Sequence, residues 1–115
     1  MLAGDRSYRI GDQILKEASM ILFKRVRDPR LNGVTLTGVK MTKDLRHAYI
    51  YYSLLGGDEQ ISLAQAGFES AKGFMRKEIG EGLRLKYVPD IKFIYDTSLE
   101  YGQKMEKLLE EVVPR

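Results

Sequence analysis

The sequence contains no cysteine and a single histidine, His47. Without cysteine the chain can form neither disulfides nor thiolate metal sites, and it has no cysteine nucleophile. His47 has no second histidine at metal-ligand spacing, and it opens a predicted strand beside a turn. We therefore expect His47 to be structural or solvated, and we expect the protein to use no metal and no cofactor.

Long apolar runs are also missing. No run approaches the ~18 residues of a membrane span, and residues 1–8 lack the apolar stretch of a signal peptide. The composition, with 43% hydrophobic and 30% charged residues in a chain of 115, is ordinary for a globular protein of one domain. We therefore expect a soluble cytoplasmic monomer with a single domain over residues 1–115 and no internal repeat or linker.

Charge is distributed unevenly along the chain, although the formal net charge is only +3. Residues 1–57 carry 10 Lys and Arg against 5 Asp and Glu, whereas residues 58–115 carry 9 against 11. The basic residues are concentrated in residues 24–30 (KRVRDPR) and 72–86. Such a separation of charge can steer a polyanion onto one face, although solvated helix faces explain it equally well before motifs are considered.

The first half of the chain predicts a helix followed by a β-hairpin. Apolar residues recur every three or four positions over residues 9–26, as on one face of an amphipathic helix, and Pro29 follows its end. Residues 34–41 and 47–54 have the composition and alternation of strands, and the short polar connection between them implies an antiparallel pair. Gly38 indicates a bulge or a close backbone approach in the first strand.

The second half predicts two helices, a third strand and a last helix. An apolar stripe runs from residue 61 to about residue 83 through the stretch SAKGFMR (residues 70–76), but it contains Gly67, Gly73, Gly80 and Gly82. Because an interior glycine costs a helix roughly 1 kcal/mol relative to alanine, we predict two helices joined by a bend, with Asp58 capping the first. Residues 91–95 predict a strand, and Thr97-Ser98-Leu99-Glu100 has the form of a capping box for the last helix.

This order of elements predicts an α+β fold, in which helices cover the apolar face of a three-stranded sheet. The sequence offers no recognisable catalytic pattern. The carboxylate pairs Glu78/Glu81 and Glu110/Glu111 have no nucleophile or oxyanion donor nearby in the sequence. Residues 80–82 (GEG) follow a helix and lack the Gly-Lys-Ser/Thr of a phosphate-binding loop. We therefore expect that the protein is not an enzyme.

Two groups of residues could contact nucleic acid instead. The tyrosines of residues 47–54 could stack on bases, but strand tyrosines more often pack half-buried, and we favour packing. Lys72, Arg76 and Lys77 lie beside the predicted bend, where a second helix starting at or just after Gly73 would expose N–H groups. Helix N-termini and basic side chains both favour phosphate oxygens, so we predict that the bend binds nucleic acid.

Several stretches resemble a known family. The order of elements is similar to that of the bacterial type of KH domain, in which a Gly-x-x-Gly loop joins two helices and clamps a single strand. Ser70-Ala71-Lys72-Gly73 occupies that place without the first glycine, and its Ala-x-Gly form resembles the interhelical kink of the ribosome-binding factor A family. Further resemblances cover nearly the whole chain: residues 27–31 (RDPRL), 39–45 (VKMTKDL), 84–89 (RLKYVP), 93–96 (FIYD) and Ser98-Leu99.

The resemblance implies a KH-like (type II) fold with a helix-kink-helix at Ala71-Lys72-Gly73. It also implies a ribosome assembly factor that binds the small (30S) ribosomal subunit and its precursor rRNA, and that assists late maturation and 5′-end processing of 16S rRNA, including in the cold. Carried over by position, Ala71 and Gly73 form the kink, and the candidate rRNA contacts are Lys72, Arg76 and Lys77. From the charge pattern we add Lys24, Arg25, Arg27, Arg30, Arg84 and Lys86.

Two alternatives remain open from the sequence. A KH-like protein that binds single-stranded RNA would bind short unstructured oligonucleotides tightly. A protein-interaction module would instead derive most of its affinity from ribosomal proteins or an assembly GTPase, and it would bind naked RNA weakly. The missing clamp glycine in residues 70–73 favours docking onto folded rRNA over threading of a single strand.

Overall fold

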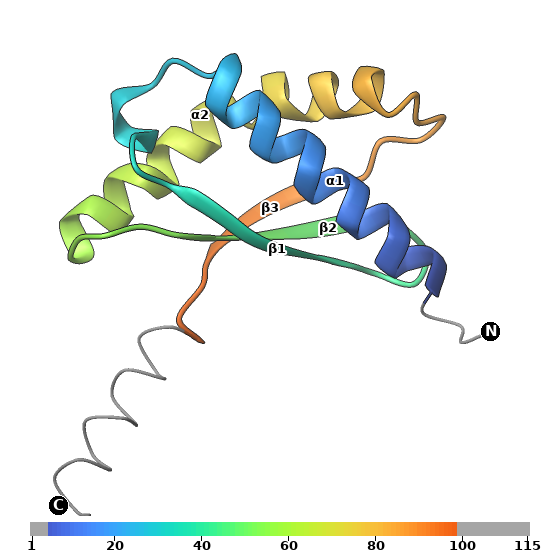
Figure 1. Ribbon diagram of the computed structural model, residues 1–115, viewed down its shortest axis with the longest axis horizontal. Helices are drawn as coiled ribbons and strands as arrows, with labels where there is room; N and C mark the ends of the chain where they lie inside the picture. Colours follow the sequence, from blue (N-terminus) through green and yellow to red (C-terminus); the bar gives the residue numbers. More distant parts are fainter. Residues whose placement is uncertain (1–4, 99–115) are drawn as a thin grey trace, which may run out of the picture.

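The computed structural model describes residues 5–98, which form an α+β fold as predicted. In chain order the elements are α1 (Asp5–Lys24), the 3-10 helix η1 (Pro29–Leu31), β1 (Thr35–Met41), β2 (His47–Ser53), α2 (Asp58–Gly82) and β3 (Asp90–Tyr95). Figure 1 shows α1 and α2 on the same side of the sheet, so these residues build two layers. Most of the predicted last helix falls outside the described residues.

The sheet has the strand order β1-β2-β3. Strands β1 and β2 pair antiparallel, which confirms the predicted hairpin, and β2 and β3 pair parallel, with α2 as the crossover that a parallel pair requires. The register of β1 against β2 shifts between Leu36 and Gly38, so the bulge predicted there is confirmed. Thr37 is the unpaired residue of the bulge, and its hydroxyl donates a hydrogen bond of 2.7 Å to the carboxylate of Asp96.

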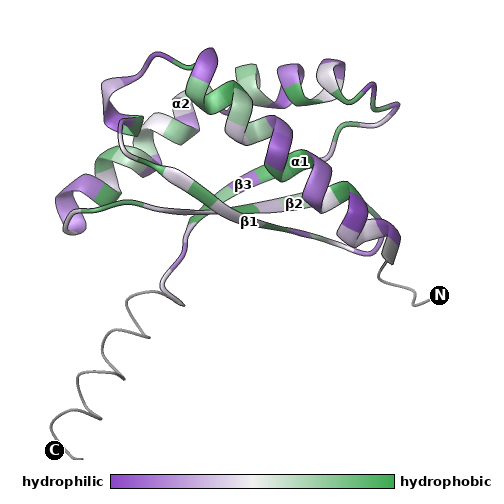
Figure 2. Cartoon of the chain, in the orientation of Figure 1, coloured by the Kyte–Doolittle hydropathy of each residue, from purple (hydrophilic) through white to green (hydrophobic). Residues whose placement is uncertain are grey.

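The core lies between the sheet and the two helices. Alternate residues of β2 are buried, as predicted, and the buried side chain of Tyr52 packs against Phe68 of α2 with ring centroids 4.7 Å apart. The Tyr52 hydroxyl donates to Gln65, whose amide donates to the carbonyl of Phe93, so this polar group is satisfied inside the core. Figure 2 shows apolar and polar residues alternating along α1, as expected for a helix with one buried side.

α2 is one helix from Asp58 to Gly82, so the prediction of two separate helices is wrong. Its ribbon changes direction midway without a break in the helix (Figure 1), so the predicted kink is a bend within α2. Buried residues precede and follow Gly73, among them Phe68 and Met75, and their packing outweighs the low helix propensity of glycine.

The start of α2 also differs from the prediction. The capping position is Gly57, whose N–H donates a 2.9 Å hydrogen bond to the side-chain oxygen of Gln60, and Asp58 is the first residue of the helix. Asp58 therefore does not cap α2, although a carboxylate in the first turn is favoured by the partial positive charge of the helix N-terminus.

Two of the glycines in α2 are explained by close approach of other segments. A Cβ atom at Gly67 would lie 3.0 Å from Cδ2 of Leu31 in η1, and a Cβ atom at Gly80 would lie 2.5 Å from Cγ2 of Val88. At Gly73, by contrast, no atom lies within 4 Å of the position that a Cβ would occupy. The glycines at both flanks of the bend are therefore packing positions, whereas Gly73 faces open space.

Candidate nucleic-acid interface

The three basic residues predicted at the bend do not share one face of α2. Lys72 and Arg76 are four residues apart and so lie on the same face. Lys77 lies on another face, together with Ser70 and Phe74, which precede it by seven and three residues. The continuity of α2 also removes the exposed N–H groups expected at Gly73, because backbone N–H groups inside a helix bond to the preceding turn. Phosphate binding at the bend would therefore depend on side chains alone.

Arg76 is engaged within the protein. Its Nε donates a 3.0 Å hydrogen bond to the carbonyl of Pro89, and its Nη2 donates one of 2.8 Å to the carbonyl of Val88. The same guanidinium lies 3.9 Å from a carboxylate oxygen of Asp90. These contacts link α2 to the segment that leads into β3, and they leave 45% of the Arg76 side chain exposed.

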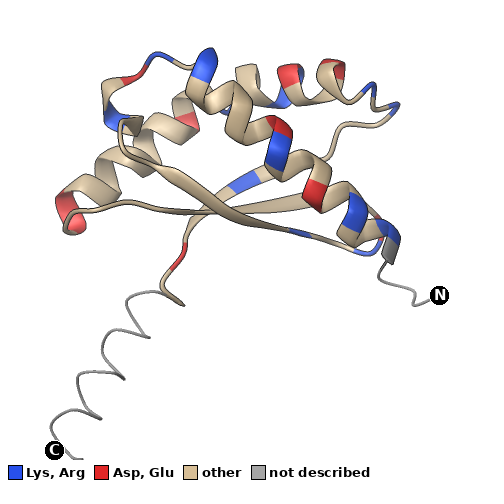
Figure 3. Ribbon diagram, viewed as in Figure 1, with Lys and Arg blue, Asp and Glu red and all other residues tan. Residues whose placement is uncertain are grey.

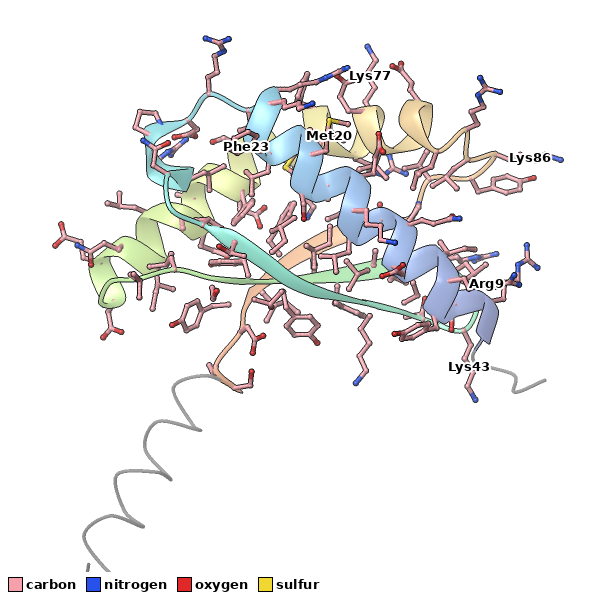
Figure 4. All side chains as sticks on the ribbon, in the orientation of Figure 1. Arg9, Met20, Phe23, Lys43, Lys77 and Lys86 are labelled. Carbon is pink, nitrogen blue, oxygen red and sulfur yellow. The ribbon has the colours of Figure 1, made fainter. Side chains whose placement is uncertain are left out.

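Four of the predicted basic residues surround the C-terminal end of α1, and Lys77 of α2 belongs to the same side of the molecule (Figures 3 and 4). Two of the four are held in ion pairs. Arg25 contacts Glu78 of α2 at 2.6 Å, and Arg30 contacts Asp28 at 2.7 Å and donates to the hydroxyl of Ser70 at 3.3 Å. We call this group the basic edge; it consists of Lys24, Arg25, Arg27, Arg30 and Lys77.

The ion pairs of the basic edge fix its backbone. The hydrogen bonds from the Arg30 side chain and backbone N–H lower the pKa of Asp28, so its carboxylate stays charged at neutral pH. Asp28 thereby holds the turn at the start of η1, and Arg25 and Arg30 tie this segment to α2. The side chains of Lys24, Arg27 and Lys77 are exposed. Within residues 5–98 these side chains have no ion-pair or hydrogen-bond partner.

An aromatic side chain stands beside this basic edge. Phe23 of α1 is 88% exposed, although it is a large apolar residue. The sequence pattern did not distinguish Phe23, because this residue falls outside the core stripe that includes Ile14, Ala18 and Ile21. Its position off the apolar period of α1 is the signal that could have identified it as an exposed aromatic residue.

The remaining predicted contacts, Arg84 and Lys86, lie elsewhere. Both belong to the segment between α2 and β3, at the end of the molecule that also holds Arg9 and Lys43 (Figure 4). The nine predicted basic residues therefore do not form one continuous site. Figure 3 shows acidic residues at the start of α2, away from both basic regions.

We also searched residues 5–98 for a metal site, a membrane-spanning helix and exposed tyrosines. No group of three or more His, Asp or Glu residues there could hold a metal ion. No helix in this range combines the length and hydropathy that a membrane span requires. His47 is exposed, and Tyr49 and Tyr51 are half-buried on the face of the sheet opposite the helices, whereas Tyr52 is fully buried.

Comparison with known proteins identifies similar sequences. The family model described as ribosome-binding factor A matches residues 6–109. The ribosome-binding factor A of Citrifermentans bemidjiense is 50% identical over 107 residues, which cover 93% of this chain and 90% of that protein. The corresponding protein of Nitrosomonas europaea is 42% identical over 108 residues, which cover 94% of this chain and 92% of that protein.

Solved structures share the fold. A solution structure of a Thermotoga maritima protein, described as a proposed ribosome binding factor A, matches with a TM-score of 0.72 and 35% identity, covering 87% of this chain and 95% of that one. A homology model of the Thermus thermophilus ribosome binding factor A, fitted into a cryo-electron microscopy map of its 30S complex, matches with a TM-score of 0.66 and 18% identity, covering 79% of this chain and 96% of that one. The KH-like α+β fold expected from the sequence is thus confirmed.

Proposed function

The chain belongs to the ribosome-binding factor A family, and we propose that it binds the small ribosomal subunit as a non-enzymatic assembly factor. In this proposal it acts in the cytoplasm as a monomer with one domain over residues 1–115. It assists late maturation and 5′-end processing of 16S rRNA, including at low temperature, without a cofactor. The observation that carries the proposal is the match of the family model over residues 6–109.

The basic edge is the surface that we assign to rRNA. Its unpaired members, Lys24, Arg27 and Lys77, can approach phosphate oxygens without first breaking an ion pair. The ion pair of Arg25 with Glu78 and the hydrogen bond from Arg30 to Ser70 keep the end of α1 and η1 fixed against α2, so the three cations keep their relative positions. Such contacts recognise the position of phosphates on folded rRNA rather than a base sequence.

The same part of α2 argues against a KH-type clamp for a single strand. In a clamp of that type, a loop between two helices grips the backbone of the nucleic acid. Residues 70–73 are helical here, so their N–H groups are used within α2. Docking of the bent helix and the basic edge onto folded rRNA is therefore the mechanism that we favour.

The test is co-sedimentation with mature and precursor small subunits, large subunits and a short single-stranded RNA across a salt series. We expect preferential, salt-sensitive retention on small subunits. The triple variant Lys24→Ala, Arg27→Ala, Lys77→Ala should bind less, and its log–log salt slope should fall by up to ~0.9 per lost phosphate contact in the duplex limit.

The control is the triple variant Lys16→Ala, Lys40→Ala, Lys92→Ala, which removes the same charge from exposed positions of α1 and the sheet. Lys16 also forms an ion pair with Asp12, but both side chains are exposed, so its loss should have little effect. It should keep the retention and the slope of the unmodified protein. Equal losses in both variants would exclude a specific role of the basic edge. Strong retention that does not depend on salt or on the edge would favour contacts with ribosomal proteins, and retention only on free single strands would contradict the proposed function.

A further inference from the structure

A second basic region forms a cleft of about 930 Å³ at the N-terminal end of α1, away from the basic edge. It is lined by three segments that are distant in the sequence: the start of α1, the β1–β2 turn and the segment between α2 and β3. Five of its lining residues are exposed and basic: Arg76, which is bonded to backbone carbonyls, and Arg6, Lys43, Arg46 and Lys86. The cleft therefore brings together cations from segments that lie far apart in the sequence.

Hydrogen bonds hold two walls of the cleft in place. In the β1–β2 turn, the carboxylate of Asp44 accepts from the Thr42 hydroxyl at 2.7 Å and from the Arg46 N–H at 3.0 Å. In the opposite wall, Arg76 donates to the carbonyls of Val88 and Pro89, as described above. Both walls are thus organised by the protein before any ligand arrives, which lowers the ordering cost of binding.

The charge balance of the cleft favours an anion. Its two acidic residues are already engaged, since Asp44 holds the turn and Asp90 lies 3.9 Å from the Arg76 guanidinium. The side chains of Arg6, Lys43, Arg46 and Lys86, in contrast, form no ion pair within 4 Å among residues 5–98. Several cations around one concave surface are suited to consecutive phosphates of a polyanion.

An exposed aromatic ring at the cleft points to the form of that polyanion. Tyr87 lines the cleft and is 80% exposed, and the amino group of Lys86 lies 5.7 Å from the centre of its ring. An exposed aromatic ring beside cations is the arrangement on which bases of a single strand stack while the cations follow the backbone. In a duplex the base faces are already stacked on each other, so they are not available to Tyr87.

We propose that this cleft binds an unpaired RNA strand, with Arg6, Lys43, Arg46 and Lys86 on the phosphates and Tyr87 stacked on one base. The inference rests on the proposed function in taking RNA as the polyanion, but it assigns a second contact site that is separate from the basic edge. The edge would dock on folded rRNA while the cleft holds a neighbouring unpaired segment.

The experiment measures fluorescence anisotropy of the full chain with two probes, a labelled ten-nucleotide single-stranded RNA of mixed sequence and a labelled blunt-ended RNA duplex. Tyr87→Ala should weaken binding of the single strand by about fivefold or more and leave duplex binding unchanged. Tyr87→Phe, which keeps the ring, should bind like the unmodified protein. Because Tyr87 is exposed, neither change should lower the thermal unfolding midpoint.

Charge variants test the phosphate contacts. Lys43→Ala with Arg46→Ala should weaken single-strand binding and lower its salt slope by up to ~0.7 per contact. The control pair Lys40→Ala with Lys92→Ala lies on the open face of the sheet and should have no effect. A loss confined to the control pair would place the strand on the sheet and overturn the cleft proposal.

Two further outcomes separate this inference from the proposed function. If Tyr87→Ala and the Lys43/Arg46 variant bind the single strand normally while small subunits still retain the protein, the cleft proposal fails and the proposed function stands. If small subunits do not retain the unmodified protein but single-strand binding depends on Tyr87, the proposed function fails and the cleft remains an RNA site.

Discussion

Two faces of the second half of α2 contain the same kinds of residues but use them in opposite ways. On one face, Gly73 looks onto open space, and the side chain of Lys77, four residues on, is exposed without a partner among the described residues. On the other face, Gly80 is buried against Val88, and Arg76, four residues before it, donates to two carbonyls of the following segment. The glycine and the basic residue of one face thus differ from those of the other in what lies next to them.

This difference shows which face of α2 supports the fold and which face is available to a ligand. The face with Arg76 and Gly80 is fixed to the segment that leads into β3, so changes there should alter the free energy of unfolding. The face with Gly73 and Lys77 makes no such contacts through these two residues, so changes there should alter binding. Variants of the two glycines and of the adjacent pair Arg76 and Lys77 test this division directly.

The largest expected effect is that of Gly80→Ala, which should lower the free energy of unfolding by about 1–3 kcal/mol. The added Cβ would lie 2.5 Å from Cγ2 of Val88, a β-branched side chain with few alternative rotamers, so the backbone there would have to move. Urea unfolding followed by circular dichroism measures the change. Unchanged stability would show that Val88 rotates away and that the close approach at Gly80 is not required.

Arg76→Ala and Lys77→Ala should separate stability from binding at adjacent positions. Loss of the two charged hydrogen bonds of Arg76 should lower the free energy of unfolding by about 1.5 kcal/mol, the low end for one such bond, because the side chain is partly exposed. Lys77→Ala should leave stability unchanged and reduce the salt slope of small-subunit binding. The division would be wrong if Lys77→Ala destabilised the protein or if Arg76→Ala left its stability unchanged.

Much of the fold could be predicted from the sequence because it follows from local periodicity. The helix of α1, the hairpin, β3 and the bulge beside Gly38 all have patterns that extend over a few residues. The continuity of α2 could not be predicted in the same way, since it depends on core residues on both sides of Gly73 outweighing the propensity of glycine itself.

Less of the candidate sites than of the fold could be predicted from the sequence. Residues 72–77 look like one basic group along the chain, but the pitch of the helix separates Lys72 from Lys77, and Arg76 has partners from residues 88–90. The cleft combines Arg6 and Lys43 with residues of the α2–β3 segment, and only the sheet topology brings these together. Charge patterns along a sequence therefore identified basic residues but not the surfaces to which they belong.

The smallest expected effect is that of Gly73→Ala, which should raise the free energy of unfolding by about 0.5–1 kcal/mol. No atom lies near the added methyl group, and Gly73 is inside a continuous helix, so alanine should gain its higher helix propensity at no steric cost. Small-subunit binding then decides the meaning of the bend. A more stable variant with reduced binding would indicate that the flexibility of glycine at this position serves recognition, because stability and binding would change in opposite directions. A more stable variant with full binding would show that the bend is set by packing on either side of Gly73, and it would remove the glycine itself from the mechanism.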